Sequence, residues 1–253
     1  SNGQTAIEQS IIGDGGFRAC PNGGFESIIQ CPPLAYSISG FPVAISVPDD
    51  YPTIQEAIEA AGSDGIIEVG PGTYNEDINF ASLTNVTLLS TEGPHRTTIQ
   101  GTGQNPVVLL WGSSGSIEGF TIRDGGGASG LGGGGIFFYG SDFDITNCII
   151  RNNTVEALGG GVVLLASVGD FNSVLITENL AGNVGGGVYS LASDTTFADC
   201  EFIGNISMKD GGGMYLHGND LDYFANASFI RTDFLDNVAH ERGGAIAGAG
   251  YYD

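Results

Sequence analysis

The sequence predicts an all-β fold, a parallel β-helix solenoid with a short N-terminal capping helix, and two repeating features support this prediction. Glycine-rich corners recur along the chain with steps of 26, 26, 26 and 32 residues. These corners lead into Ile136, Val162, Val188, Met214 and Ile246. An asparagine column keeps the same register, at Asn153, Asn179, Asn205 and Asn237. Short β-branched and aromatic runs between such corners describe one coil of a parallel β-helix.

The corner residues have a structural explanation. Glycine adopts left-handed backbone conformations without steric cost, and asparagine tolerates them. Equivalent residues of successive coils stack about 4.8 Å apart in a solenoid. Stacked asparagine amides are therefore expected to hydrogen-bond from coil to coil, and we interpret the asparagine column as a structural ladder.

Residues 47–78 predict the start of the solenoid. Thr53 and Glu56 form a capping box ahead of an apolar helical face, so we expect a helix at about residues 53–62. Because the open end of a solenoid must be covered, this helix is the expected lid. Less regular coils should follow, and regular coils are expected at about residues 116–253. The predicted β-helix domain therefore covers residues 47–253.

The first 46 residues do not follow the repeat, and we expect them to form an N-terminal extension. A disulfide between Cys20 and Cys31 would close a short, turn-rich loop and would indicate an exported protein. Cys148 and Cys200 share a column of the repeat with Val174 between them, about 10 Å apart and too far to bridge. We expect both to be small buried apolar groups.

The charge of the chain restricts its partners. Acidic side chains outnumber basic ones 29 to 7, and the formal net charge of -22 repels phosphate backbones and anionic membranes. The sequence also has no apolar run of about 18 residues that could span a bilayer. We therefore expect no nucleic-acid partner and no membrane span, and the predicted disulfide leads us to expect an extracellular or cell-surface protein.

Two stretches resemble known β-helix families. Residues 53–78, TIQEAIEAAGSDGIIEVGPGTYNEDI, resemble the opening of many right-handed parallel β-helix proteins, broadly called pectin-lyase-like. The segments FIGN at 202–205 and FLDN at 234–237, paired with GGGM and GGAI, resemble the FxxN and GGA[ILV] repeats of chlamydial polymorphic outer-membrane proteins. The resemblance implies a right-handed coil. It also implies either an adhesive surface protein or a polysaccharide-active enzyme.

The catalytic motifs of the pectin-lyase-like enzymes are not found, so candidate residues rest on charge alone. Two arginines share an outward column beside acidic corner residues, where they could act as a base or as substrate clamps; surface ion pairs are the alternative. The candidate catalytic residues are Arg123, Arg151, Asp124 and Glu178. Carboxylates favoured by calcium occur in the segments SDFD and NDLD. The candidate calcium ligands are Asp142, Asp144, Asp220 and Asp222.

Strand alternation predicts an apolar outer face just after the glycine corners. Its residues are Phe137, Tyr139, Val163, Tyr189 and Tyr215. Such a face should not be left bare. Either it is covered within the chain, or it is a binding face for sugar rings, another copy or a partner protein.

These observations favour an extracellular or cell-surface β-helix module with a structural or adhesive role. Its expected partners are surface polysaccharide or further copies of the chain, which could assemble end to end because the sequence ends inside a coil. The alternative hypothesis is a lyase or hydrolase of the pectin-lyase-like type that acts on polysaccharide, with calcium as its cofactor.

Overall fold

The computed structural model describes residues 17–19, 25–27, 44–127, 132–218 and 225–249. The chain divides into two units, Ser1–Tyr36 and Ser37–Asp253. In the first unit, strands β1 (Phe17–Ala19) and β2 (Phe25–Ser27) pair in antiparallel fashion. The second unit is the solenoid. Cys20 and Cys31 lie outside the described residues, so their disulfide stays a prediction.

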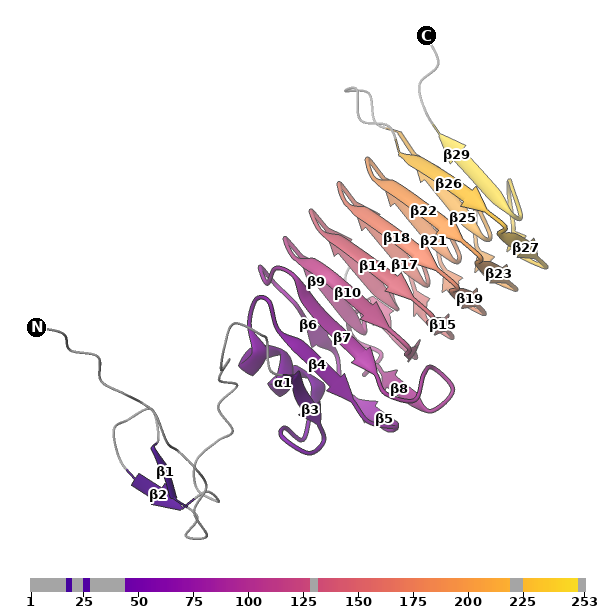
Figure 1. The fold of residues 1–253 in the computed structure, drawn as a ribbon. Coiled ribbons are helices and arrows are strands. Elements are labelled where there is room, and N and C mark those ends of the chain that lie inside the picture. The colour runs from indigo at the N-terminus through magenta and orange to yellow at the C-terminus, as the bar shows by residue number, and fades with distance from the viewer. Residues whose placement is uncertain (1–16, 20–24, 28–43, 128–131, 219–224, 250–253) are drawn as a thin grey trace, which may run out of the picture. The chain divides into compact units, whose positions relative to one another are not determined.

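The solenoid consists of stacked coils whose equivalent strands form four parallel sheets (Figure 1). Within the described residues, sheet 1 has eight strands. They are β26 (Asn226–Ile230), β22 (Asp194–Ala198), β18 (Val168–Asn172), β14 (Asp142–Thr146), β10 (Ser114–Glu118), β7 (Val86–Ser90), β4 (Ile66–Val69) and β3 (Ala44–Val47). Strand β3 pairs with β4, so residues Ala44–Val47 also belong to the solenoid.

The other sheets follow sheet 1 around each coil. Sheet 2 contains β27 (Asp233–Leu235), β23 (Glu201–Ile203), β19 (Leu175–Thr177), β15 (Ile149–Arg151), β11 (Thr121–Arg123), β8 (Thr97–Gln100) and β5 (Gly72–Asn75). Sheet 3, which is short, contains β12 (Gly126–Gly127), β16 (Thr154–Val155), β20 (Leu180–Ala181), β24 (Ile206–Ser207) and β28 (Val238–Ala239). Sheet 4 contains β29 (Ile246–Ala249), β25 (Met214–His217), β21 (Val188–Leu191), β17 (Val162–Leu165), β13 (Ile136–Tyr139), β9 (Val108–Trp111) and β6 (Ile78–Asn79).

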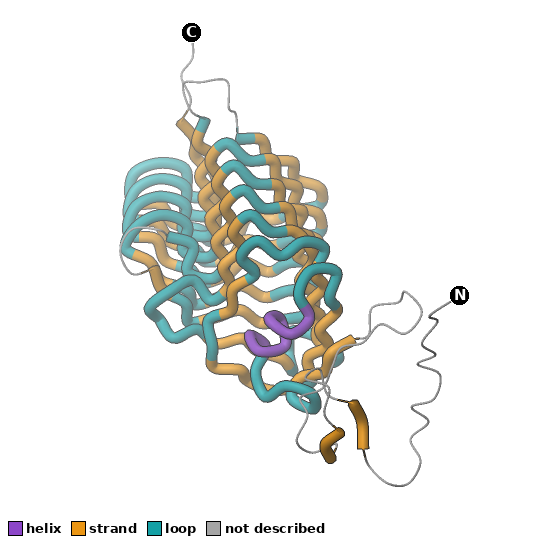
Figure 2. The backbone as a smooth tube through the Cα atoms, turned by 90° about the vertical axis from the view of Figure 1, so that its left-hand side faces the viewer, coloured by secondary structure: helices purple, strands orange, loops and turns teal. Residues whose placement is uncertain are grey.

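Helix α1 (Ile54–Ala61) lies at the N-terminal end of the stack (Figure 2). The side chain of Thr53 accepts the backbone N–H of Glu56 at 3.2 Å and begins the helix, as the capping box predicts. The carboxylate of Glu76 accepts the N–H groups of Ile54 and Gln55 at 3.0 and 2.9 Å. Ile54 and Ile58 are fully buried in the core, so the helix covers the interior of the first coils.

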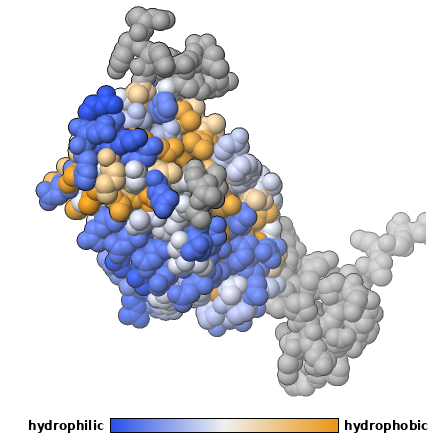
Figure 3. All heavy atoms as spheres, turned by 180° about the vertical axis from the view of Figure 1, so that it is seen from behind, coloured by the Kyte–Doolittle hydropathy of each residue, from blue (hydrophilic) through white to orange (hydrophobic). Residues whose placement is uncertain are grey.

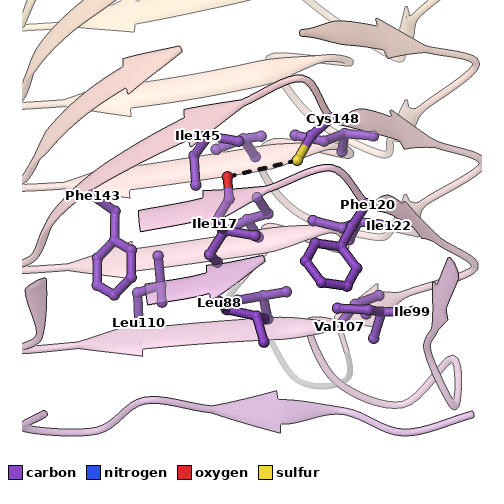
Figure 4. Packing of buried hydrophobic residues seen from close by; sticks show 14 of the residues in the cluster. Leu88, Ile99, Val107, Leu110, Ile117, Phe120, Ile122, Phe143, Ile145 and Cys148 are labelled. Atoms are coloured by element: carbon purple, nitrogen blue, oxygen red, sulfur yellow. Dashed lines mark hydrogen bonds between the residues drawn. The ribbon is translucent and has the colours of Figure 1, made fainter. Parts of the chain in front are cut away.

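The core runs along the inside of the coils as columns of stacked side chains. Ile117 aligns with Ile145, and Phe171 aligns with Phe197, as the repeat predicts. Figure 4 shows part of this core, in which apolar side chains from successive coils point inward and contact one another. The predicted all-β parallel β-helix with one short helix is therefore confirmed. Among the described residues, no helix is long and apolar enough to cross a membrane.

Cys148 and Cys200 are both unpaired and buried, each with 1% of its surface exposed. The thiol of Cys148 contacts the carbonyl oxygens of Thr146 and Ile117 at 3.2 and 3.8 Å, the second of which is drawn in Figure 4. Burial raises the pKa of Cys148 to about 11. Because a neutral buried thiol is a poor nucleophile, these cysteines act as core residues.

Two polar ladders connect the coils at their corners. The asparagine ladder joins Asn153, Asn179, Asn205 and Asn237 through side-chain amide hydrogen bonds. A serine ladder, absent from our sequence interpretation, joins the backbone N–H of each serine to the hydroxyl of the next. Its members are Ser113, Ser141, Ser167 and Ser193. The signal for it is present in the sequence, since these serines recur at the period of the repeat.

Candidate functional site

The predicted apolar face is largely covered within the chain, which is one of the two alternatives that the sequence left open. Four of its residues have 1, 0, 4 and 8% of their surface exposed, namely Phe137, Val163, Tyr189 and Tyr215. Leu158 and Val184, from the segments between sheets 3 and 4, pack against them. Figure 2 shows these segments as a row of stacked loops beside the main coil. For these four positions the first alternative of the sequence analysis holds, because the chain folds back over them.

The glycine corner permits this fold-back. A Cβ atom at Gly161 would lie 2.7 Å from the carbonyl oxygen of Gly187 and 3.0 Å from the side-chain nitrogen of Asn179. Only glycine fits such a close approach between neighbouring coils.

The tyrosines beneath the loops keep a polar contact, since the hydroxyl of Tyr189 hydrogen-bonds Nδ1 of His217 at 2.8 Å. Burial and the nearby Tyr215 raise the pKa of Tyr189 to about 12.

Tyr139 is the exception on this face, since 44% of its surface is exposed. Its ring stacks on that of Trp111 in the neighbouring coil, with centroids 4.3 Å apart and planes inclined by 23°. Trp111 is 45% exposed. The two residues therefore form an exposed aromatic pair at the ends of β9 and β13.

Two of the catalytic candidates, Arg123 and Asp124, are in contact. Nη1 of Arg123 lies 3.1 Å from a carboxylate oxygen of Asp124, and Nη2 donates to the side-chain oxygen of Gln100 at 2.9 Å. Arg151 aligns with Arg123 in the next coil. Glu178 belongs to the coil after that, about 10 Å from Asp124 by the strand spacing.

Backbone geometry gives a simpler reason for the acidic residues at these corners. Asp124 and Glu178 have φ angles of 58° and 55°, in the left-handed region that a tight corner requires. Their column is a structural corner of the coil, where aspartate is well tolerated. Arg123 is held by its neighbours, as expected for a surface ion pair.

The described calcium candidates lie in a polar groove on sheet 1. Asp142 and Asp144 point outward from β14 and are exposed. The groove has a volume of about 280 Å³ and is lined by Asn85, Thr87, Ser114, Gly115, Ser116, Asp142 and Asp144. Burial, together with the carboxylates of Asp170 and Asp142, raises the pKa of Asp144. The residues that line the groove include no lysine or arginine.

The outer face of sheet 1 continues this polar surface along the stack. One column of aligned residues consists of Thr87, Ser116, Asp144, Asp170, Thr196 and Ser228. Our sequence interpretation did not identify it, although polar residues at alternate positions of SGS, DFD, VGD, DTT and NAS indicate such a face. In the described ranges, no group of three or more His, Cys, Asp or Glu side chains could hold a metal ion. Asp220 and Asp222 lie outside those ranges.

A second, larger hollow lies on the outside of sheet 3. Its volume is about 580 Å³, and it is lined by Gly103, Gly126, Gly127, Thr154, Val155, Glu156, Leu180, Gly182 and Met208. This lining is mainly glycine and apolar, with Glu156 as its one ionisable residue. The polar groove of sheet 1 is therefore richer in groups that can bind or react.

Large apolar side chains are exposed near the C-terminal end of the described solenoid. Seen from behind, hydrophobic residues are more frequent toward this end, where they lie among hydrophilic ones, and the other end is mainly hydrophilic (Figure 3). The exposed residues include Ile206, Met208, Ile230, Leu235, Val238 and Ile246. Residues 250–253 are outside the described part of the chain, so end-to-end assembly stays a prediction.

Three solved structures were found to be similar to the chain. The pectin methylesterase from carrot is 12% identical with a TM-score of 0.42, and the match covers 85% of this chain and 90% of that one. A pectin methylesterase from Aspergillus niger, in deglycosylated form, is 12% identical with a TM-score of 0.42, covering 87% and 94%. The same enzyme in penultimately deglycosylated form is 13% identical with a TM-score of 0.39. No curated protein sequence matches the chain.

The family comparison agrees with the observed fold. The model of the right handed beta helix region matches residues 95–249, more than half of the chain. These residues include the regular coils and both polar ladders. The chain therefore belongs to the right-handed beta helix family.

Proposed function

We propose that the protein is an extracellular or cell-surface β-helix module that binds a polysaccharide without cleaving it, in an attachment or structural role. The observation that carries this proposal is the polar groove on sheet 1. Its serine and threonine hydroxyls and its asparagine amide both donate and accept hydrogen bonds, and its carboxylates accept them. Sugar hydroxyls need this mixture of partners.

The groove residues come from three neighbouring strands, β7, β10 and β14, and from Asn85, which directly precedes β7. These strands are hydrogen-bonded to each other in register, so the polar groups have fixed spacings before any ligand binds. A rigid binding surface loses little conformational entropy on binding. This arrangement supports recognition of an extended polymer that lies along the sheet.

Charge favours an uncharged polysaccharide. The groove carries Asp142 and Asp144, with Asp170 in the next coil, and the whole chain has a formal net charge of -22. A polyuronate would be repelled by these carboxylates. The arginines of the catalytic candidates lie on sheet 2 and not on this face. A neutral glycan with free hydroxyl groups is therefore the expected ligand.

Calorimetric titration with soluble xylan, galactomannan, hydroxyethyl cellulose and polygalacturonate tests the proposal. At least one neutral polymer should bind, and polygalacturonate should not. The double variant Asp142→Ala, Asp144→Ala should bind the neutral polymer at least about tenfold more weakly, since two acceptors are lost. Asp233→Ala, an exposed aspartate on sheet 2, is the matched control and should bind within about twofold of the parent. Absence of binding to all neutral polymers, or a preference for polygalacturonate, would overturn the proposal.

A polysaccharide-cleaving enzyme is the second candidate, because the pKa of Asp144 is raised beside a second carboxylate in a groove. A carboxyl group that keeps its proton can act as a general acid in glycoside cleavage. New reducing ends released from the bound neutral polymer, and lost in Asp144→Asn, would favour the enzyme. Binding without new reducing ends would favour the attachment module.

A further inference from the structure

The exposed aromatic pair of Trp111 and Tyr139 needs an explanation. The two rings stack on each other, yet each leaves almost half of its surface exposed. At the same column in the next two coils stand Leu165 and Leu191, which are half-buried. An exposed pair of large aromatic rings on a rigid sheet is a frequent feature of binding surfaces, because burying it on contact releases water from apolar surface.

Open space lies next to the pair. Trp111 is followed by Gly112 and Tyr139 by Gly140, and a Cβ atom at either glycine would meet no heavy atom within 4 Å. The next two coils carry Ala166 and Ala192 at this corner. The two coils that carry the aromatic rings therefore have no side chain at this corner, whereas the next two coils have a methyl group there. A ligand could approach the rings from this side.

The corner also joins the aromatic pair to the polar groove. Ser114 follows Trp111 by three positions and Asp142 follows Tyr139 by three, and both Ser114 and Asp142 line the groove. Three residues of extended chain span at most about 11 Å. The buried serine hydroxyl of Ser141 accepts the backbone N–H of Ser113 at 3.2 Å, which ties the two corners together. The pair and the groove therefore lie close to each other on the same two coils.

We propose that Trp111 and Tyr139 form an aromatic subsite that stacks against one sugar ring of a neutral polysaccharide whose neighbouring sugars occupy the groove. A sugar ring has an apolar face of C–H groups and an edge of hydroxyl groups. The aromatic pair can stack against the apolar C–H face. The hydroxyls and carboxylates of the groove can hydrogen-bond the hydroxyl groups at the edge. The carboxylates beside the corner disfavour an anionic ligand. This inference rests on the proposed function, and it adds the residues that set the length of the bound oligosaccharide.

The chain offers a direct probe of this subsite, because Trp111 is its single tryptophan. All intrinsic tryptophan fluorescence therefore reports on the proposed subsite. Neutral oligosaccharides with two to six sugars, from the polymer that binds most tightly by calorimetry, are titrated while the emission of Trp111 is recorded. The emission should shift to shorter wavelength as the ring leaves water. The longer oligosaccharides should give the shift, whereas a disaccharide confined to the groove should not.

Variants provide the second arm of the test. Trp111→Ala and Tyr139→Ala should each weaken binding of the six-sugar oligosaccharide about tenfold while leaving the disaccharide within about twofold. Leu235→Ala is the matched control, since Leu235 is another exposed large apolar residue, at 50%, on sheet 2, which carries neither the pair nor the groove. It should leave binding of both ligands unchanged.

The outcomes separate this inference from the proposed function. If the neutral polymer binds by calorimetry but neither the Trp111 emission nor the two aromatic variants respond, the subsite is wrong and the groove proposal stands. If no neutral polymer binds, the proposed function fails and the subsite fails with it. A fluorescence shift that survives the double variant Asp142→Ala, Asp144→Ala at unchanged affinity would place binding on the aromatic pair alone, and would contradict a shared site.

Discussion

The side-chain oxygen of Asn179 accepts two hydrogen bonds from Asn153 in the preceding coil, from its side-chain amide at 3.0 Å and from its backbone N–H at 3.1 Å. The amide nitrogen of Asn179 in turn donates to the backbone carbonyl of Ile150 at 3.0 Å and to the side-chain oxygen of Asn205 at 2.9 Å. One buried amide thus satisfies polar groups of the coil before its own and of the coil after it. The ladder holds the coils in register where the core is interrupted by a corner.

Asn179→Ala should lower the free energy of unfolding by about 3 kcal/mol, because it leaves the buried N–H of Asn153 and the carbonyl of Ile150 without these partners. Urea unfolding followed by circular dichroism measures the loss. Asn172→Ala, an exposed asparagine at the end of β18, is the control and should change stability by less than about 0.5 kcal/mol. Equal losses in both variants would show that the ladder contributes no special stability.

Gly161→Ala should be far more damaging than Gly204→Ala. The added methyl group at Gly161 would press on the carbonyl oxygen of Gly187, at 2.7 Å, and separate the coils, with an expected cost of about 3 kcal/mol. At Gly204 the φ angle is 62° and the space is open, so only the left-handed backbone is strained, at about 1 kcal/mol. Thermal unfolding of both variants checks the order. A reversed order would mean that backbone conformation, and not close approach, explains the glycine corner.

Replacement of Ser190 and of Ser193, two serines of one coil, by alanine should change the stability of the protein in opposite directions. The hydroxyl of Ser190 is fully buried in the core and has no hydrogen-bond partner among the described residues, so Ser190→Ala should raise stability by about 1 kcal/mol. Ser193 accepts the N–H of Ser167 at 3.0 Å and donates to the carbonyl of Leu191 at 2.8 Å. Ser193→Ala should therefore lower stability by about 1–2 kcal/mol. Urea midpoints of the two variants that shift in the same direction would contradict this assignment.

Asp144 should make the stability of the solenoid depend on pH. Its pKa is raised by burial and by the carboxylates of Asp170 and Asp142, so its favourable contribution is complete below the ordinary value of 3.8 and is lost as the pH rises through the raised pKa. Asp144→Asn removes the repulsion and should stabilise the protein by about 0.5 kcal/mol at pH 7 and not at pH 3. Urea unfolding at both pH values measures this difference.

Asp194 is the control for this experiment. It faces Val168 and Asn226 in the adjacent coils instead of a carboxylate. Asp194→Asn should therefore show no gain in stability between pH 3 and pH 7. A gain as large as that of Asp144→Asn would mean that the net charge of the chain, and not the local pair, causes the effect.

Much of the fold could be predicted because the repeat converts sequence spacing into spatial register. Residues one period apart must stack when coils follow one another, so Asn153 and Asn179 meet, and Cys148 and Cys200 lie in one buried column. The capping helix was also readable, since Thr53 and Glu56 carry a local signal. These features depend on neighbours along the chain or on a fixed period.

The candidate site was less accessible to such reasoning. Alternation along a strand gives the direction of a side chain, but it does not show what lies above it. Val163 points outward as predicted, and Leu158 of the fold-back loop nevertheless covers its face. Asp124 and Glu178 were catalytic candidates from the sequence, and their left-handed backbone angles give both of them a structural role at corners.

By itself the sequence determined the all-β solenoid, its period, its cap and the inward columns, since each follows from local propensity and regular spacing. The tertiary structure alone decided which outward residues remain exposed. The groove of Ser116 and Asp144 and the pair of Trp111 and Tyr139 depend on side chains from different coils and on where a loop folds back. Surface exposure results from contacts between distant parts of the chain, and the period of a repeat does not encode it.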